Sequence, residues 1–176
     1  MPYALITGGV RSGKSGFAEQ RAGYDRRVLY VATGRAWDEE MEQRIKLHQE
    51  RRPAEWGVLE SGAPLTETLA DQDGWDCILI DCLSTWLSCI LLELPEPEWR
   101  AESTRRSVHA EAERLADHFA HPDRSAVIVT TETGLGGVAL SPLGRAFQDL
   151  LGEVNQIVAK RAEDVYLIIA GRALKL

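Results

Sequence analysis

Short runs of apolar residues alternate along this chain with longer stretches of mixed polarity, which indicates a regular succession of strands and helices. Five runs have the length of a strand and are apolar at nearly every position, so the strands they predict are buried on both faces. These runs are Tyr3–Thr7, Arg27–Thr33, Cys77–Asp81, Ala126–Thr130 and Val165–Ile169. Trp56–Glu60 is a candidate for a shorter strand, and the tail after Ile169 is long enough to pair with its neighbour.

The stretches between these runs predict helices. They begin and end near Ser15–Arg21, Asp38–Arg51, Pro64–Ala70, Leu83–Leu92, Trp99–Ala120 and Pro142–Arg161. In the last two, apolar residues recur every three or four positions, as on the buried face of a helix. Residues Gly134–Gly137 predict a mobile loop. Alternating strands and helices favour a three-layer α/β fold, with a mostly parallel central sheet flanked by helices, in one domain over residues 1–176.

Binding sites in such sheets lie beyond the carboxyl ends of the strands. That rule brings four segments to one edge, namely Gly8–Ser15, Thr33–Gly34, Asp81–Cys82 and Thr131–Glu132. We therefore expect the chemistry of this protein at that edge.

Composition narrows the class of protein. The chain has 176 residues, of which 44% are hydrophobic and 27% charged, and its net charge is −7. An acidic surface disfavours non-specific binding to nucleic acids or anionic membranes. The longest apolar stretch, Leu83–Leu94, is too short and too polar to span a bilayer, and no signal peptide is evident. The three cysteines show no zinc spacing, so we expect reduced thiols in a cytoplasmic protein.

One segment matches the phosphate-binding P-loop pattern G-x-x-x-x-G-K-[ST] at every required position. It consists of Gly8, Gly9, Val10, Arg11, Ser12, Gly13, Lys14 and Ser15. A strand precedes it and a helix follows, so an ordinary glycine turn is the weaker interpretation. The glycines let backbone N–H groups approach an anion, the Lys14 ammonium would reach the β- and γ-phosphates, and the Ser15 hydroxyl would ligate Mg²⁺. The fold is therefore expected to be of the P-loop NTPase type.

Two further residues are candidates for chemistry. Asp81 ends an apolar strand, which suggests a carboxylate that holds Mg²⁺, although it could instead cap the following helix. His48 shares a helix face with Arg44 and Arg51, where guanidinium groups would keep the imidazole neutral and nucleophilic. The alternative is that His48 is a packed histidine, because it also continues an apolar stripe with Ile45.

These residues resemble a known family, the bifunctional adenosylcobinamide kinase / adenosylcobinamide-phosphate guanylyltransferases of cobalamin biosynthesis. The resemblance covers essentially the whole chain and is most specific in the pattern Arg44-Ile45-x-x-His48-x-x-x-Arg52-Pro53-x-x-Trp56. The other matching segments are Thr7–Ser15, Val28–Thr33, Asp38–Met41, Asp81–Thr85, Glu132–Gly136 and Gly152-x-x-Asn155-Gln156.

The resemblance implies two reactions. A nucleoside triphosphate, ATP or GTP, phosphorylates adenosylcobinamide, and GTP then guanylylates His48, which passes GMP to the phosphorylated corrinoid to give adenosylcobinamide-GDP. Beyond the P-loop, the nucleotide contacts it implies are Ala32, Thr33, Gly34, Gln49, Glu50, Arg51, Arg52, Glu60 and Asp81. It also implies a compact homo-oligomer, typically a trimer, that acts with Mg²⁺.

The chain departs from the family's pattern in one loop. Thr131 stands where members often have Asn, and Gly137–Leu140 replaces the usual Ile-Val-Pro-Glu. These departures spare His48 and the P-loop and fall on the loop that would cover the substrate. Two other functions stay open from the residues alone. They are a single-activity P-loop kinase of another small alcohol, and a nucleotide-dependent switch.

Overall fold

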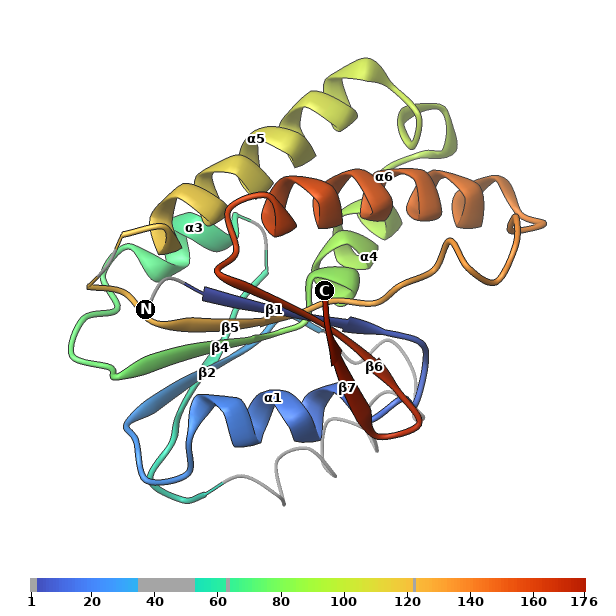
Figure 1. Cartoon of the computed structure of the whole chain (residues 1–176). Helices are drawn as coiled ribbons and strands as arrows, with labels where there is room; N and C mark the ends of the chain where they lie inside the picture. Colours follow the sequence, from blue (N-terminus) through green and yellow to red (C-terminus); the bar gives the residue numbers. More distant parts are fainter. Residues whose placement is uncertain (1–2, 35–52, 63, 122) are drawn as a thin grey trace.

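The fold is built on a seven-stranded sheet with the strand order β3-β2-β4-β5-β1-β6-β7 (Figure 1). The computed structural model describes residues 3–34, 53–62, 64–121 and 123–176. The strands are β1 (Tyr3–Gly8), β2 (Val28–Ala32), β3 (Gly57–Glu60), β4 (Cys77–Asp81), β5 (Ala126–Val129), β6 (Asp164–Ile169) and β7 (Arg172–Lys175). All neighbours pair in parallel except β7, which runs antiparallel to β6. The predicted strands and the predicted mostly parallel sheet are confirmed.

Helices cover both faces of this sheet. They are α1 (Lys14–Ala22), α3 (Leu65–Leu69), α4 (Leu83–Glu93), α5 (Glu102–Phe119) and α6 (Pro142–Ala159), with a short 3-10 helix at Glu96–Glu98. Figure 1 shows α1 on one face and α3, α4, α5 and α6 on the other. The predicted three-layer arrangement is therefore confirmed. The predicted helix Asp38–Arg51 lies outside the described residues.

The pleat of the strands creates a separate core on each face. Along β1, Tyr3 and Leu5 join the larger core under α3 to α6, whereas Ala4 and Ile6 join the smaller core under α1. Successive side chains of a strand point to opposite faces, so a central strand needs apolar residues at both parities. This explains why the strands read as continuous apolar runs.

One predicted helix begins later than its sequence pattern suggested. Trp99 precedes α5 and follows the 3-10 helix, while the predicted helix began at Trp99 itself. Its indole Nε1 donates to the carbonyl oxygens of Leu91 and Leu94 at 2.9 and 3.0 Å. The side chain thus closes the end of α4, since the last carbonyls of a helix lack partners within it.

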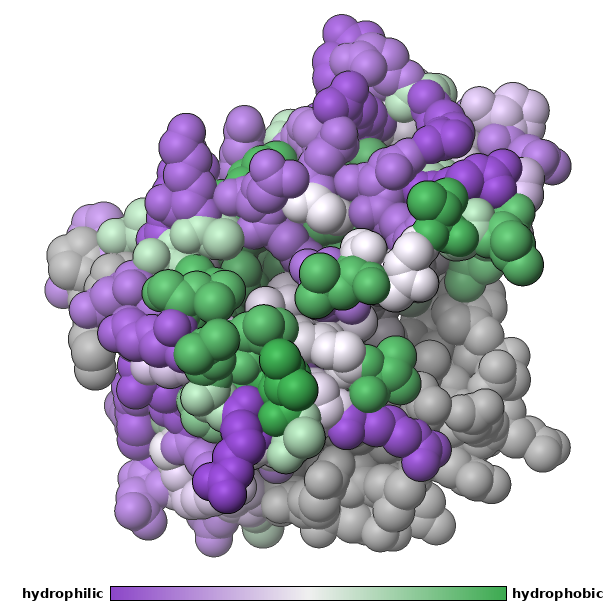
Figure 2. Space-filling model, turned by 45° about the vertical axis from the view of Figure 1, so that its right-hand side comes forward, coloured by the Kyte–Doolittle hydropathy of each residue, from purple (hydrophilic) through white to green (hydrophobic). Residues whose placement is uncertain are grey.

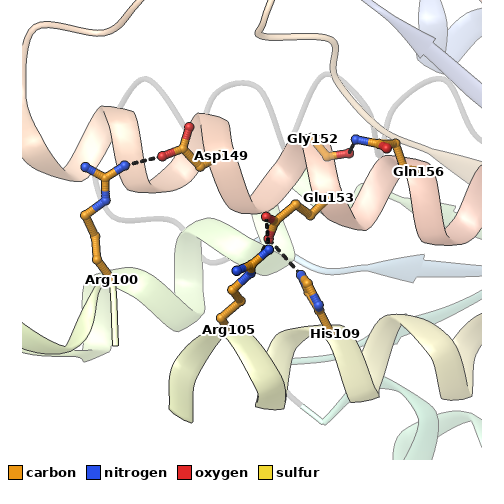
Figure 3. A network of polar contacts seen from close by, with 7 residues as sticks. All are labelled: Arg100, Arg105, His109, Asp149, Gly152, Glu153 and Gln156. Atoms are coloured by element: carbon orange, nitrogen blue, oxygen red, sulfur yellow. Dashed lines mark hydrogen bonds and ion pairs between the residues drawn. The ribbon is translucent and has the colours of Figure 1, made fainter. Parts of the chain in front are cut away.

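Helices α5 and α6 are joined on their outer side by charged residues (Figure 3). Glu153 on α6 accepts from Arg105 at 2.6 and 3.0 Å and contacts Nε2 of His109 at 2.8 Å. Although burial raises the pKa of Glu153, the hydrogen bonds from His109 and Arg105 outweigh burial and leave the pKa below its usual value. Arg100 and Asp149 form a further pair nearby. These contacts fix α6 relative to α5. Within the described ranges, no helix is both long enough and apolar enough to cross a bilayer.

Candidate nucleotide-binding site

The P-loop, residues 8–15, leaves the carboxyl end of β1 and enters α1. Gly8 and Gly13 have φ values of 149° and 100°, in the region that favours glycine. A Cβ added to Gly8 would lie 2.4 Å from the carbonyl oxygen of Ile168, and one added to Gly13 would lie 3.3 Å from Cα of Gly171. The two glycines of the motif are therefore required both by backbone conformation and by the close approach of β6 and its turn.

The turn between β6 and β7 supports the P-loop from the side. Ala170 and Gly171 both have positive φ, 49° and 75°, and the N–H of Gly171 donates to the carbonyl oxygen of Ser12 at 2.8 Å. On the other side, the N–H of Glu132 donates to the carbonyl oxygen of Gly8 at 3.1 Å. The loop is thus held by backbone hydrogen bonds from two other parts of the chain.

Lys14 begins α1 and lies over its own loop. Its Nζ donates to the carbonyl oxygen of Gly9 at 2.7 Å. Burial lowers the pKa of Lys14, and the nearby Cys82 and Asp81 oppose that change. A bound phosphate would place a negative charge beside this partly buried ammonium and favour its charged form.

Asp81 ends β4 at the same edge of the sheet as the P-loop. The hydroxyl of Tyr30 on β2 donates to its Oδ2 at 2.8 Å, which orients the carboxylate. In the sheet, β5 alone lies between β4 and β1. Asp81 is therefore about 10 Å along the edge from the strand that carries the P-loop, taking about 4.8 Å for each strand.

A cluster of small polar side chains surrounds the start of α4. The sequence predicted that Thr33, Cys82 and Thr131 lie at this edge, but it did not predict the contacts that join them. The Thr33 hydroxyl lies 2.7 Å from Oγ1 of Thr85 and donates to the carbonyl oxygen of Cys82 at 2.7 Å. Ser84 lies between Sγ of Cys82 and Oγ1 of Thr131, at 2.8 and 3.1 Å. Hydroxyl and thiol groups from the ends of β2, β4 and β5 are thereby linked. The sequence signal was the resemblance segment Asp81–Thr85, in which a role had been predicted for Asp81 but not for Cys82, Ser84 or Thr85.

The loop of residues 130–141, which joins β5 to α6, lies next to the P-loop. Side chains of α6 hold its backbone. Nε2 of Gln148 donates to the carbonyl oxygens of Thr133 and Gly137 at 2.8 and 2.9 Å, and its Oε1 accepts from the N–H of Ala139 at 2.8 Å. Asn155 accepts from the Thr130 hydroxyl at 2.6 Å and donates to the carbonyl oxygen of Thr131 at 3.1 Å. Gln148 gave no signal in the sequence, whereas Asn155 is part of the last resemblance segment.

The other predicted contact residues lie along the same edge but further from the P-loop. Ala32 ends β2 and pairs with Asp81 on one side and Glu60 on the other. Thr33 and Gly34 follow Ala32, and Gly34 lies against Thr85. Glu60 ends β3, four strands from β1, which corresponds to about 19 Å along the edge. The predicted contacts therefore fall into a phosphate end, near β1 and β4, and a distal end, near β2 and β3.

His48, together with Gln49, Glu50, Arg51 and Arg52, lies outside the described residues.

The residues at the phosphate end suit magnesium bound together with a nucleotide. Among the described residues, no group of three or more His, Cys, Asp or Glu side chains is arranged to hold a metal ion. Mg²⁺ in phosphate-transfer sites instead takes one or two protein ligands and completes its shell with phosphates and water. A hydroxyl at Ser15 and an oriented carboxylate at Asp81 fit that donor set.

Comparison with solved structures extends the description of the fold. The chain is similar to the P4 protein from bacteriophage phi6 in complex with ADP, with a TM-score of 0.52, 15% identity and 98% of this chain covered. It is also similar to an ATPase from the type III secretion system of pathogenic bacteria, with a TM-score of 0.54, 14% identity and 94% of this chain covered. The match covers 54% and 50% of those longer chains. At this identity the likeness concerns the fold alone, which is that of the P-loop NTPases.

Comparison with curated proteins finds much nearer relatives. The chain is 36% identical to the bifunctional adenosylcobalamin biosynthesis protein CobU of Escherichia coli (strain K12), over 98% of both chains. It is 38% identical to the bifunctional adenosylcobalamin biosynthesis protein CobP of Pseudomonas aeruginosa, over 98% of this chain and 95% of the relative. A family model described as cobinamide kinase / cobinamide phosphate guanyltransferase matches residues 4–176. The chain therefore belongs to the cobinamide kinase / cobinamide phosphate guanyltransferase family.

Proposed function

We propose that this protein catalyses two successive reactions of cobalamin biosynthesis. In the first, a nucleoside triphosphate phosphorylates the hydroxyl of the aminopropanol arm of adenosylcobinamide. In the second, GMP from GTP is transferred to that phosphate, which gives adenosylcobinamide-GDP. Family membership and relatives named as bifunctional adenosylcobalamin biosynthesis proteins support the pair of reactions.

The observation that carries the proposal is the P-loop, with Lys14 and the oriented carboxylate of Asp81 at one edge of the sheet. Both reactions are displacements at phosphorus, so positioning and neutralisation of charge supply most of the catalysis. Backbone N–H groups of a glycine loop at the start of a helix supply both.

In the kinase reaction, the acceptor oxygen bonds to the γ-phosphorus while the bond to the bridging oxygen breaks and a nucleoside diphosphate leaves. Lys14 would hold the β- and γ-phosphates, because its ammonium lies over the loop that cradles them. Ser15 and Asp81 would hold Mg²⁺ between the protein and the nucleotide. When bound, Mg²⁺ neutralises phosphate charge.

In the guanylyl transfer, a nitrogen of His48 would attack the α-phosphorus of GTP and release pyrophosphate. The phosphate of the corrinoid would then displace the imidazole from the phosphoramidate. This splits the transfer into two in-line steps. The distal contacts Ala32, Thr33, Gly34 and Glu60, with Gln49, Glu50, Arg51 and Arg52, would hold the nucleotide during this reaction. The positions of Ala32 and Glu60 at the ends of β2 and β3 support a nucleotide placed further along the edge than the P-loop itself.

We also propose that the protein acts in the cytoplasm as a homotrimer. An apolar surface on β6 and β7, formed by Ile169, Leu174 and Leu176, supports an assembly because these side chains are exposed in the single chain.

Labelling with GTP that carries a radioactive α-phosphate tests the reaction and the residue together. With Mg²⁺ present, we expect acid-labile, alkali-stable label on the wild type, as for a phosphoramidate, and none on His48→Ala. His121→Ala is the matched control, because His121 is exposed and pairs with Asp123 on the surface. Absence of label from the wild type would contradict the histidine intermediate and favour a single-activity kinase of a small alcohol. Hydrolysis stimulated by a protein partner, with indifference to corrinoids, would favour a nucleotide-dependent switch.

A further inference from the structure

The loop of residues 130–141 exposes large apolar side chains beside the P-loop. Leu135, Val138 and Leu140 are 83%, 80% and 97% exposed, and Val10 within the P-loop is 76% exposed. We call these four side chains the apolar rim. Figure 2 shows hydrophobic side chains gathered where this loop leads into α6, apart from those over β6 and β7. Single exposed leucines are ordinary on a protein surface, but apolar side chains that gather at the edge of a site mark binding surfaces.

The backbone of the loop that carries most of the rim is hydrogen-bonded to side chains of α6 at several positions. Gln148 bonds it at Thr133, Gly137 and Ala139, as described above. Arg145 donates to the carbonyl oxygens of Ala139 and Leu140 at 3.2 and 2.7 Å. Several polar backbone groups of the loop are hydrogen-bonded to Gln148 and Arg145 of α6, and the apolar side chains of the loop are exposed to solvent. A loop held in this way does not hide those side chains by folding them inward.

The position of the rim relative to the phosphates indicates what it contacts. The N–H of Glu132 bonds to Gly8, so the loop and the P-loop adjoin at the carboxyl ends of neighbouring strands. The P-loop encloses the triphosphate from the side of α1, and an acceptor hydroxyl must reach the γ-phosphorus in line from the open side. The body of a large acceptor must then lie against segments that adjoin the P-loop, and the loop of residues 130–141 is one of them.

We propose that the apolar rim is the docking surface for the corrin macrocycle of the acceptor. This inference rests on the proposed function, because it takes the acceptor to be a corrinoid. The edge of a corrin ring carries methyl groups alongside its amide side chains, and the methyl groups suit contact with Val10, Leu135, Val138 and Leu140. A small alcohol would reach the phosphate without touching them. The rim therefore selects acceptors by the ring rather than by the hydroxyl that reacts.

The test compares a rim variant, Leu135→Ser with Val138→Thr and Leu140→Ser, with the control Leu92→Ser. Leu92 is half exposed on α4, outside the site. Equilibrium dialysis measures the binding of adenosylcobinamide, and initial rates give KM for it and for the nucleotide. We expect the rim variant to weaken corrinoid binding and raise its KM about tenfold or more, since several apolar contacts are lost. The nucleotide KM and the labelling from GTP should stay as in the wild type.

A truncated acceptor, 1-amino-2-propanol, shows whether the ring is the part recognised. Turnover of this alcohol, however slow, should be equal in wild type and rim variant. Unchanged corrinoid binding in the variant would overturn the inference, as would an equal loss with the truncated alcohol. A changed oligomeric state by sedimentation would also overturn it, by assigning the rim to an interface between copies. Failure of the wild type to bind corrinoid at all would instead overturn the proposed function and the inference together.

Discussion

The P-loop and the loop of residues 130–141 lie beside each other at one edge of the sheet, yet they are held by different kinds of contact. Backbone groups hold the P-loop. Gly8 and Gly13 adopt positive φ, and N–H groups from Glu132 and Gly171 bond to it. Side chains hold the second loop, above all Gln148 from α6.

Because the two loops are held by different contacts, we expect that binding of the nucleotide and binding of the acceptor can be altered separately. The conformation of the phosphate cradle depends on glycine positions and on neighbouring backbone, so side-chain changes on α6 should leave it intact. The second loop depends on α6, and α6 in turn is fixed to α5 through Glu153. We therefore expect variants on α6 to alter the handling of the acceptor while sparing the nucleotide. The three predictions below test this separation in order of decreasing effect.

Lys14→Ala removes the cation of the cradle while keeping its backbone. Kinase turnover should fall by about 100-fold or more, because a charged group that contacts the transferred phosphoryl is lost. Steady-state assays with adenosylcobinamide measure this, with Lys160→Ala at the exposed end of α6 as the matched control. The free energy of unfolding should not fall, since burial disfavours the charged form of Lys14. Wild-type rates in Lys14→Ala would show that this loop is not the phosphate site.

Gln148→Leu removes three hydrogen bonds from the second loop. Each is worth about 1 kcal/mol, so partial loss of the loop's conformation should lower kcat/KM for the corrinoid about tenfold. The KM for nucleotide and the labelling from GTP should not change. Gln156→Leu is the control, because Gln156 is also on α6 and its side chain donates to the carbonyl oxygen of Gly152 within the helix. A matching loss of nucleotide binding in Gln148→Leu would show that the two loops are not independent.

Glu153→Gln acts one step further from the site and should have the smallest effect. The folded-state pKa of Glu153 is lowered, so its contribution to stability is present above the unfolded pKa and is lost as pH falls through the folded pKa. At pH 7 the free energy of unfolding of the variant should be about 1 kcal/mol lower than that of the wild type. This deficit should shrink as the pH falls below the ordinary carboxyl pKa of about 4.3 and should disappear below the lowered folded-state pKa of Glu153. Urea unfolding at several pH values measures it, with the more exposed Asp149→Asn for comparison. A deficit independent of pH would assign the effect to packing rather than charge.

The difference between a loop held by backbone groups and a loop held by side chains also explains which features could be predicted from the sequence. The P-loop was predicted residue by residue, because its conformation is encoded by glycines within eight neighbouring positions. The strand ends that carry Ala32, Glu60 and Asp81 were also predicted, since continuous apolar runs define buried strands. The contacts of Gln148 were not, because they join residues that are nine to fifteen positions apart in the chain and no local pattern marks them. The role of Trp99 at the end of α4 was missed for a similar reason, since its helical spacing concealed a side-chain contact with the preceding helix.

The place of β1 in the sheet bears on how the protein is made. This strand lies between β5 and β6 in the sheet. In the P-loop that follows it, the carbonyl oxygen of Ser12 accepts a hydrogen bond from the N–H of Gly171. Both strands that flank β1 are thus translated long after the phosphate cradle itself. On the ribosome, β1 therefore emerges with both of its edges unpaired and is exposed to mispairing and to chaperones. Because the cradle is incomplete until β5 and β6 have been made, ATP or GTP cannot assist the early folding of this strand.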